Sequence, residues 1–286
     1  MATLSSHVIA ATPALLAAAL LLGGCAQEPE PLRLYAFDGG RMRLNDVRIF
    51  SPPYPDTVRP VTIGNPAFLV VHPEGTLLWD AGFSDRYVGG PPERRELALG
   101  TILMDRTLED QLADVGYGVD EIDYVAPSHM HTDHAGNLDK LTAATCLLQA
   151  AEYEAAFESP DPTHFHFDPA DYDAYPAARV EVIPETYDVF GDGRVVIHAA
   201  PGHSPGHQVL LLRLAETGNV VLSGDLYHLQ YNRDHRVNPS VQYDTAASYR
   251  SMEKVDALLA ANDATLWIQH EPALSDTLRM APLYYE

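Results

Sequence analysis

The chain has 286 residues, 46% of them hydrophobic, and carries 18 basic against 40 acidic residues, a formal net charge of −22. This size and composition fit a globular, enzyme-sized protein with a substantial core. The excess of acidic groups argues against nucleic acid and anionic membrane surfaces as partners, because both present negative charge, and indicates a solvated surface that keeps the protein soluble.

The N-terminal stretch Val8 to Leu22 is almost wholly apolar and has the length of a signal-peptide core, too short to span a membrane comfortably. Leu22-Gly23-Gly24-Cys25 then resembles the lipobox of bacterial lipoproteins, whose cysteine is acylated after cleavage. The usual positive region before the core is missing, since the first basic residue is Arg33. We expect residues 1–25 to be a signal and lipobox segment, and the protein to be exported to the periplasm or envelope with a lipid anchor at Cys25. An ordinary cleaved signal peptide and a start codon placed too early are the alternatives.

Residues 26–31 are polar and carry two prolines, which predicts a tether, and the folded domain is expected to span residues 32–286. Leu32 to Phe37 alternates and predicts a strand, which Asp38-Gly39-Gly40 should end. Residues 66–72 and 76–80 predict a hairpin. Asp80 ends its second strand, where a carboxylate either caps the loop or orients a histidine ligand.

A short buried strand is expected at residues 122–127, and it runs directly into a segment in which four metal-capable side chains fall within six residues: His129, His131, Asp133 and His134. Because residues i and i+2 of an extended segment point the same way, His129 and His131 can hold one ion. A turn at Thr132 can then direct Asp133 and His134 to a second ion. Imidazole and carboxylate donors suit zinc, iron, nickel or cobalt better than calcium or magnesium. The alternative, a polar loop that happens to be rich in histidine, does not account for the downstream residues described below.

The segments around this motif give weaker signals. Helical spacing of apolar residues predicts a helix over 106–115 before it, and a further helix at 136–141 and a strand at 146–150 should follow it. Cys146, in that apolar run, is expected to be a buried and inert thiol. Residues 151–179 predict a long loop with an aromatic lining, in which His164 and His166 are surface or pocket residues rather than ligands.

Three later strands each lead to another metal-capable residue. The first runs into the turn Pro201-Gly202, which carries His203, the natural third ligand for the ion at His129 and His131. The strand from residue 219 delivers Asp225, whose two oxygens could bridge two ions, and the strand from residue 264 ends at His270. Apolar residues at helical spacing predict a helix over 245–262 between these two strands. His207 is expected to have a structural role.

Together, His129-x-His131-x-Asp133-His134, Pro201-Gly202-His203, Ser223-Gly224-Asp225 and His270 resemble the ligand set of the metallo-β-lactamase fold hydrolases, over nearly all of the chain from residue 32. The resemblance implies an α/β fold: an αββα sandwich of two mixed sheets face to face, with helices outside. It also implies two divalent transition-metal ions, with Zn²⁺ favoured and Fe, Co or Mn as alternatives. One ion would take His129, His131 and His203, the other Asp133, His134 and His270. Asp225 would bridge them, and Asp80 and His207 would support the ligands from behind.

The stretch from Gly224 to His228, residues 230–233 and the tail 281–286 are similar to N-acyl homoserine lactonase family proteins. This similarity implies a quorum-quenching enzyme that opens the lactone ring of this small-molecule substrate by attack of a metal-bridging hydroxide. Some of those lactonases place a substrate-binding tyrosine three residues after the bridging aspartate, whereas here that residue is His228 and the tyrosine is Tyr227.

We expect either Tyr227 or His228 to donate a hydrogen bond to the carbonyl oxygen, and Asp133 to carry a proton to the leaving oxygen. Two alternatives to a lactonase stay open. The first is another dinuclear hydrolase of the same fold, acting on organophosphates, thioesters or other lactones. The second is a metal-binding envelope protein without activity.

Overall fold

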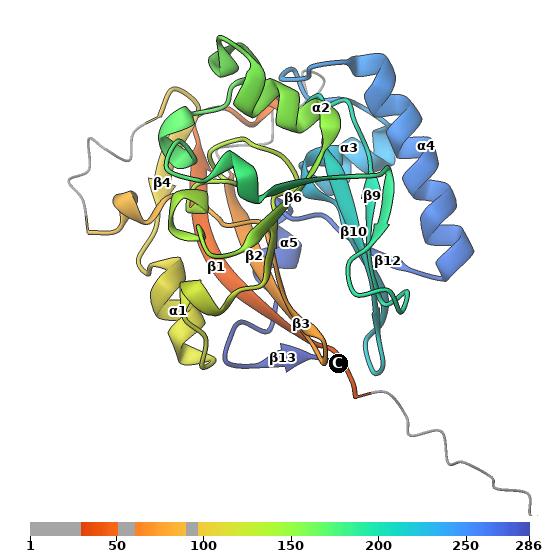
Figure 1. Ribbon diagram of the computed structural model, residues 1–286. Coiled ribbons are helices and arrows are strands. Elements are labelled where there is room, and N and C mark those ends of the chain that lie inside the picture. Colours follow the sequence, from red (N-terminus) through yellow and green to blue (C-terminus); the bar gives the residue numbers. More distant parts are fainter. Residues whose placement is uncertain (1–29, 51–60, 90–96) are drawn as a thin grey trace, which may run out of the picture.

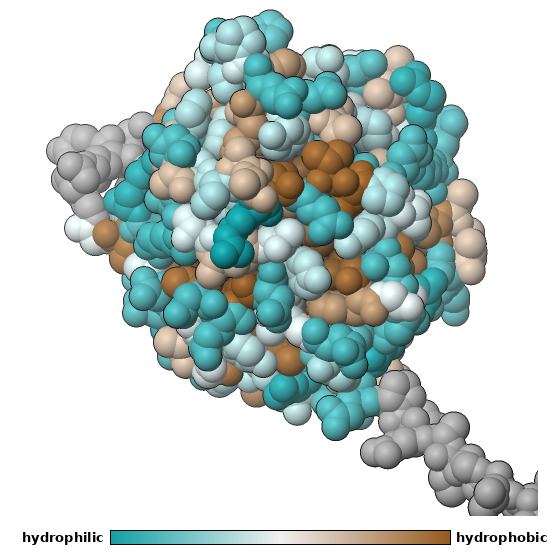
Figure 2. Space-filling model, in the orientation of Figure 1, coloured by the Kyte–Doolittle hydropathy of each residue, from teal (hydrophilic) through white to brown (hydrophobic). Residues whose placement is uncertain are grey.

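Two mixed β-sheets lie face to face with helices on their outer sides in the computed structural model (Figure 1), which describes residues 30–50, 61–89 and 97–286. The predicted αββα sandwich is therefore confirmed. The predictions for Cys25 and for most of the tether lie outside the described residues. Within the described ranges, the helices are all too short or too polar to cross a membrane. On the face drawn in Figure 2, hydrophobic residues gather only in small patches between hydrophilic ones, as the acidic composition predicts.

The first sheet has the strand order β13-β1-β2-β3-β5-β6-β7, with β4 paired to β1. Its strands are β1 (Arg33–Leu44), β2 (Thr62–His72), β3 (Gly75–Trp79), β4 (Gly100–Leu103), β5 (Tyr124–Ala126), β6 (Thr145–Gln149), β7 (Val180–Ile183) and β13 (Tyr284–Tyr285). Strands β3, β5, β6 and β7 run parallel to one another. Their carboxyl ends therefore share one edge of the sheet, so the chain leaves β3 at Asp80, β5 just before His129 and β6 just before Glu152 at the same edge.

The second sheet has the order β12-β11-β10-β9-β8. Its strands are β8 (Thr186–Asp188), β9 (Val195–Ala199), β10 (Gln208–Leu214), β11 (Gly218–Leu222) and β12 (Thr265–Trp267). Strand β10 is antiparallel to both β9 and β11, and β11 is parallel to β12, so β9, β11 and β12 all run in one direction. These three strands lead to His203, Asp225 and His270, which consequently emerge at a common edge.

Alternation along the strands sends apolar side chains to both faces of each sheet. Between the sheets, side chains such as Val70 and Leu77 pack against Leu210 and Leu222. The opposite face of the first sheet is covered by α1 (Leu108–Asp114), and the opposite face of the second by α4 (Thr245–Asn262). Figure 1 shows these two helices on opposite sides of the molecule. The remaining α-helices are short: α2 (Ala150–Tyr153), α3 (Gln230–His235) and α5 (Pro272–Ser275).

The structure differs from the sequence-based expectation in three places. Asp38-Gly39-Gly40 does not end the first strand, because the register of β1 against β2 shifts there and the strand continues as a bulge. A Cβ at residue 39 would lie 2.4 Å from the carbonyl oxygen of Asn65, so only glycine fits this crossing. The helix expected at 136–141 is a single 3₁₀ turn (Leu138–Lys140). Residues 151–179, expected to be a loop, contain α2 and several short turns.

The buried, free thiol of Cys146 is confirmed, and burial raises its pKa.

Candidate metal centre

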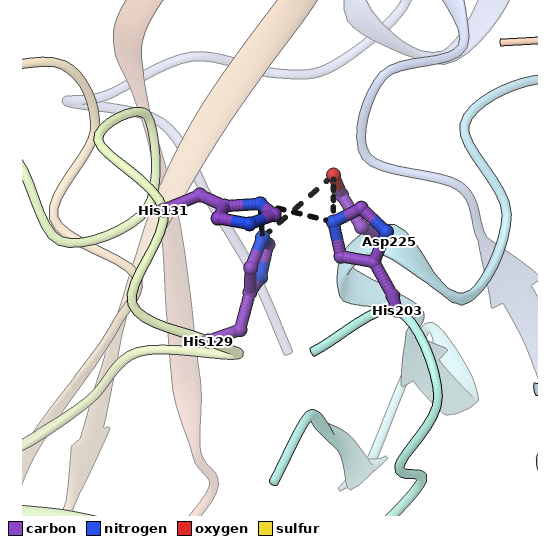
Figure 3. A group of neighbouring side chains, drawn as sticks. All are labelled: His129, His131, His203 and Asp225. Carbon is purple, nitrogen blue, oxygen red and sulfur yellow. Dashed lines mark hydrogen bonds and ion pairs between the residues drawn. The ribbon is translucent and has the colours of Figure 1, made fainter. Parts of the chain in front are cut away.

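Seven histidine and aspartate side chains from four separate segments converge where strands of both sheets end. They form two groups, the first made of His129, His131, His203 and Asp225, and the second of Asp133, His134 and His270. The candidate ligand atoms of each group lie within 4.8 Å of one another. Figure 3 shows the first group, in which the four side chains point toward a common centre from the loop after β5, the turn after β9 and the turn after β11.

Asp225 lies between the two groups, and its two carboxylate oxygens face different ones. Its Oδ2 atom is 3.3 Å from His203 Nε2 and 3.8 Å from His129 Nε2. Its Oδ1 atom is 3.2 Å from His134 Nε2 and 3.0 Å from His270 Nε2. One carboxylate that presents an oxygen to each group has the arrangement needed to bridge two cations.

In the first group, ring nitrogens of three histidines face one another. His131 Nε2 donates its hydrogen to the carbonyl oxygen of Phe165 at 3.0 Å, which leaves His131 Nδ1 as a lone pair. That nitrogen lies 2.7 Å from His129 Nε2 and 3.0 Å from His203 Nε2. Burial and the neighbouring imidazoles lower the pKa of both His129 and His131 well below the usual value, so both rings are in the neutral form that binds metal.

The second group brings two histidine rings and several carboxylates together in a way that favours a cation between them. His134 Nδ1 donates to Asp80 Oδ2 at 3.0 Å, and His270 Nδ1 donates to the carbonyl oxygen of Gly64 at 2.7 Å. If both rings were neutral, they would direct their Nε2 lone pairs at each other across 3.3 Å. Burial lowers the pKa of both rings, but carboxylates, led by Asp80 for His134 and by Asp225 for His270, outweigh it and raise the pKa. A metal ion supplies the positive charge that this arrangement demands, so the residues fit the metal that the motif implies.

Asp80 holds the second group in place from behind. Besides His134, it accepts hydrogen bonds from the backbone N–H of Ser128 at 2.5 Å and from Gln269 Nε2 at 2.7 Å. Its φ of +59° lies in the left-handed region, which is unfavourable for residues other than glycine and persists where the surroundings fix it. Of the two interpretations that the sequence left open for Asp80, the structure favours the orientation of a histidine.

His207 lies outside both groups and orients Asp225. Its Nδ1 donates to the carbonyl oxygen of Ala200 at 3.0 Å, and its Nε2 accepts the backbone N–H of Asp225 at 2.9 Å. Gly224 has a φ of +49°, and a Cβ there would lie 2.6 Å from His207 Nε2. The turn that presents Asp225 therefore requires glycine at this position.

A cavity of about 340 Å³ opens beside the two groups. Apart from the metal-capable side chains, its wall is mainly apolar and includes Met42, Phe50, Ile63, Phe83, Leu97 and Val241. Such a wall suits a ligand with a hydrocarbon portion.

The structure distinguishes between Tyr227 and His228, the two candidates that the sequence offered for a contact with the carbonyl oxygen. His228 lines the cavity, with its Nε2 3.1 Å from Asp225 Oδ2 and its ring stacked on Phe50 at 4.4 Å. Burial lowers the pKa of His228 to about 4, so the ring is neutral near pH 7. The prediction that Tyr227 could contact the substrate is wrong, because its side chain is buried with Met252 and Val255 of α4. The backbone is extended at Tyr227, and successive side chains of an extended segment point to opposite sides.

Glu152 is a supporting residue that the sequence analysis missed. It lies in α2, directly after β6, and its side chain is completely buried. Its Oε1 accepts the backbone N–H of Met130 at 2.8 Å, and its Oε2 accepts the Ser204 hydroxyl and the Gly206 N–H, both at 2.7 Å. Glu152 thus connects the loop that carries His129 and His131 to the turn that carries His203. The available signal was an acidic residue directly after an apolar strand, inside a stretch that was expected to be loop.

The αββα sandwich and the two groups of metal-capable residues define a class, the metallo-β-lactamase fold proteins. The chain belongs to the Metallo-beta-lactamase superfamily, whose family model matches residues 62–270. It is 27% identical over 264 residues to the N-acyl homoserine lactonase AttM of Rhizobium johnstonii, covering 89% of this chain and 98% of the relative. The N-acyl homoserine lactonase AiiA of Bacillus thuringiensis subsp. kurstaki is 25% identical over 257 residues, covering 88% of this chain and 98% of that one.

Solved structures agree with this placement. An N-acyl homoserine lactone hydrolase with the product N-hexanoyl-L-homoserine bound at its catalytic metal centre superposes with a TM-score of 0.73 at 26% identity, covering 88% of this chain and 98% of that one. A Bacillus thuringiensis AiiA variant with N-decanoyl-L-homoserine bound has the same TM-score, identity and coverage. The dizinc quorum-quenching lactonase AidC shares the fold, with a TM-score of 0.63 at 18% identity over 85% of this chain and 88% of that one.

The buried hydrogen bonds of Glu152 make its removal costly. Glu152→Ala leaves two buried backbone N–H groups without an acceptor, so we expect the free energy of unfolding to fall by about 3 kcal/mol or more. Glu152→Gln keeps one acceptor oxygen and should cost less. Urea denaturation at a fixed metal concentration measures both. Glu154→Ala, an exposed change in the same segment, is the matched control and should stay within about 0.5 kcal/mol of the unchanged protein. Equal losses for Glu152→Ala and Glu154→Ala would contradict the role of Glu152.

Proposed function

We propose that this protein is a dinuclear metal-dependent hydrolase that opens the lactone ring of N-acyl homoserine lactones. The observation that carries the proposal is the Asp225 carboxylate, which presents one oxygen to each group of ligands beside a largely apolar cavity. The relatives that match almost their whole length to this chain are N-acyl homoserine lactonases. The lactone would lie at the metal groups and the acyl chain along the apolar wall.

The metal ligands follow from the same geometry. His129, His131 and His203 would hold one ion, Asp133, His134 and His270 the other, and Asp225 both. Zn²⁺ is the ion we propose, because nitrogen and carboxylate donors in this number suit it, although Fe, Co and Mn accept the same donors. When bound, such ions lower the pKa of a coordinated water and polarise a carbonyl group.

The side chains around the metal groups have separate tasks in this proposal. His228 faces the cavity next to Asp225, and its Nε2–H, 3.1 Å from Asp225 Oδ2, could turn from that carboxylate to the carbonyl oxygen as negative charge develops there. Asp133 lines the same cavity with its Oδ2 3.5 Å from His270 Nε2. From there its carboxylate can accept a proton and pass it to the ring oxygen as the lactone opens.

A substrate panel tests the reaction class. Metal-loaded protein should hydrolyse an N-acyl homoserine lactone in preference to a β-lactam, a thioester and paraoxon measured side by side. A preference for paraoxon or the thioester would move the protein to another branch of the superfamily. No hydrolysis of any of them would favour a binding protein over an enzyme.

Metal content tests the bridging role of Asp225. Elemental analysis after metal loading should find two ions per chain, and Asp225→Asn should lose at least one of them together with most activity, because the amide has no charge and a single oxygen to share. Asp234→Asn, an exposed change on α3, serves as the control and should keep both ions. A content of one or zero in the unchanged protein would count against the dinuclear centre.

Turnover in fully metallated variants tests the roles of His228 and Asp133. We expect His228→Ala to lower kcat by about a hundredfold, the typical effect of removing one donor to a developing oxyanion, whereas Tyr227→Phe should have little effect. Asp133→Asn should lower kcat even in molecules that retain both ions. Near-normal turnover in a metallated Asp133→Asn protein would rule out Asp133 as the residue that transfers the proton.

We also propose that the protein is an exported lipoprotein anchored at Cys25. The support is the apolar stretch and the lipobox-like residues before Cys25, followed by the predicted tether. Two or more acyl groups at an N-terminal cysteine suffice for stable anchoring. The chain should fractionate with membranes in its native cell, and Cys25→Ser should release or mislocalise it. Recovery of an unprocessed protein from the cytoplasm would refute this location.

A further inference from the structure

His166 is fixed against the metal centre through both of its neighbours in the chain. The carbonyl oxygen of Phe165 accepts the His131 Nε2 hydrogen at 3.0 Å, and Phe167 pairs with His131 in an isolated antiparallel bridge. The backbone on either side of His166 is therefore attached to a residue of the first metal group. His166 cannot move far without disturbing the hydrogen bond that orients His131.

The backbone of His166 is also in an unfavourable conformation. Its φ is +63°, in the left-handed region, and its N–H donates to the carbonyl oxygen of Thr163 at 3.0 Å. Non-glycine residues held in this region cluster at functional sites, where the surroundings fix them. Here the attachments of Phe165 and Phe167 to His131 supply that constraint.

The His166 ring forms part of the cavity wall. It lies 6.2 Å from the His131 ring, centroid to centroid, and it is exposed. Phe165 and Phe167, whose rings are 5.8 Å apart, hold the segment on either side of it. No residue that the structure describes hydrogen-bonds to this imidazole. Thr132, the neighbouring polar side chain of the wall, already donates its hydroxyl to Asp171 Oδ2 at 2.5 Å.

The substrate class has one polar group that the metal centre does not occupy. In an N-acyl homoserine lactone the amide carbonyl is separated from the lactone carbonyl only by the α-carbon and the amide nitrogen. When the lactone lies at the metal groups, the amide lies just beyond them, where the cavity wall is otherwise largely apolar. An amide carbonyl that leaves water without a new hydrogen-bond partner loses free energy, so a donor in this part of the wall would favour lactones that carry an amide.

We propose that His166 is a specificity-determining residue whose imidazole N–H donates a hydrogen bond to the amide carbonyl oxygen of the N-acyl homoserine lactone. This inference rests on the function proposed above. His164 is the matched control, because it lies two residues earlier on the same turn, is exposed and does not line the cavity.

The test compares two substrates in the metal-loaded, full-length protein. One is N-decanoyl-L-homoserine lactone, and the other is an α-alkyl-γ-butyrolactone of equal chain length in which methylene groups replace the amide. The quantity measured is the ratio of kcat/KM for the first substrate to that for the second. His166→Ala should lower this ratio by about three- to tenfold, the effect of losing one hydrogen bond, with the change mainly in KM for the amide substrate.

Two further variants and a binding measurement complete the test. His166→Asn keeps an N–H donor and tolerates the left-handed conformation, so its ratio should lie between those of His166→Ala and the unchanged protein. His164→Ala should leave the ratio unchanged. Calorimetry with the ring-opened product N-decanoyl-L-homoserine should show weaker binding to His166→Ala. Metal content and thermal unfolding of each variant are measured alongside.

The outcomes separate this inference from the function on which it rests. Hydrolysis of both lactones with the same ratio in His166→Ala and the unchanged protein would overturn the role of His166 alone, since a merely structural residue lowers both rates together. An equal fall of the ratio in His164→Ala would overturn it as well. Failure of the unchanged protein to open any lactone would overturn the proposed function and the role of His166 with it.

Discussion

The Nε2 atoms of His134 and His270, which face each other across 3.3 Å, are the constraint on which the rest of the structure depends. Each ring is locked in this orientation because its other nitrogen donates to a fixed acceptor, Asp80 in one case and the backbone of Gly64 in the other. Two acceptors at this distance repel unless positive charge lies between them. The supporting hydrogen bonds therefore fix more than the positions of the ligands, because they make the centre unsatisfied until a cation is present.

The strand directions explain why so many ligands meet at one place. Parallel strands of the first sheet end together at Asp80, at the His129 loop and at Glu152, while three strands of the second sheet that share one direction lead to His203, Asp225 and His270. Short turns at these ends carry the functional residues, and most residues of the strands β3, β5, β6, β9 and β11 behind them are buried. The apolar wall of the cavity comes from segments that extend beyond this edge, such as the paired parts of β1 and β2 that carry Met42 and Ile63.

Most of the fold and all seven candidate metal ligands could be predicted from the sequence, because metal ligands leave a dense local pattern. His129, His131, Asp133 and His134 follow one another at spacings that few other functions need, and each later ligand follows an apolar strand. Supporting residues leave no such pattern. Glu152 acts through backbone groups of loops distant in sequence, and the choice between Tyr227 and His228 depended on the backbone conformation of a single residue. The bulge in β1 was missed for a similar reason, since consecutive glycines can end a strand or let one bend past a neighbour.

Each metal group takes donors from both halves of the sandwich. His129, His131, Asp133 and His134 belong to a loop of the first sheet, whereas His203, Asp225 and His270 follow strands of the second. A bound ion would therefore be a cross-link between two layers that otherwise adhere through side-chain packing and buried hydrogen bonds, such as that from Gln269 to Asp80. A ligand that binds only the folded state raises the free energy of unfolding in proportion to the logarithm of the free ligand concentration. The stability of this protein would therefore depend on the concentration of free metal around it. A protein released into a metal-poor environment would lose its catalyst and part of the force joining its sheets at the same moment.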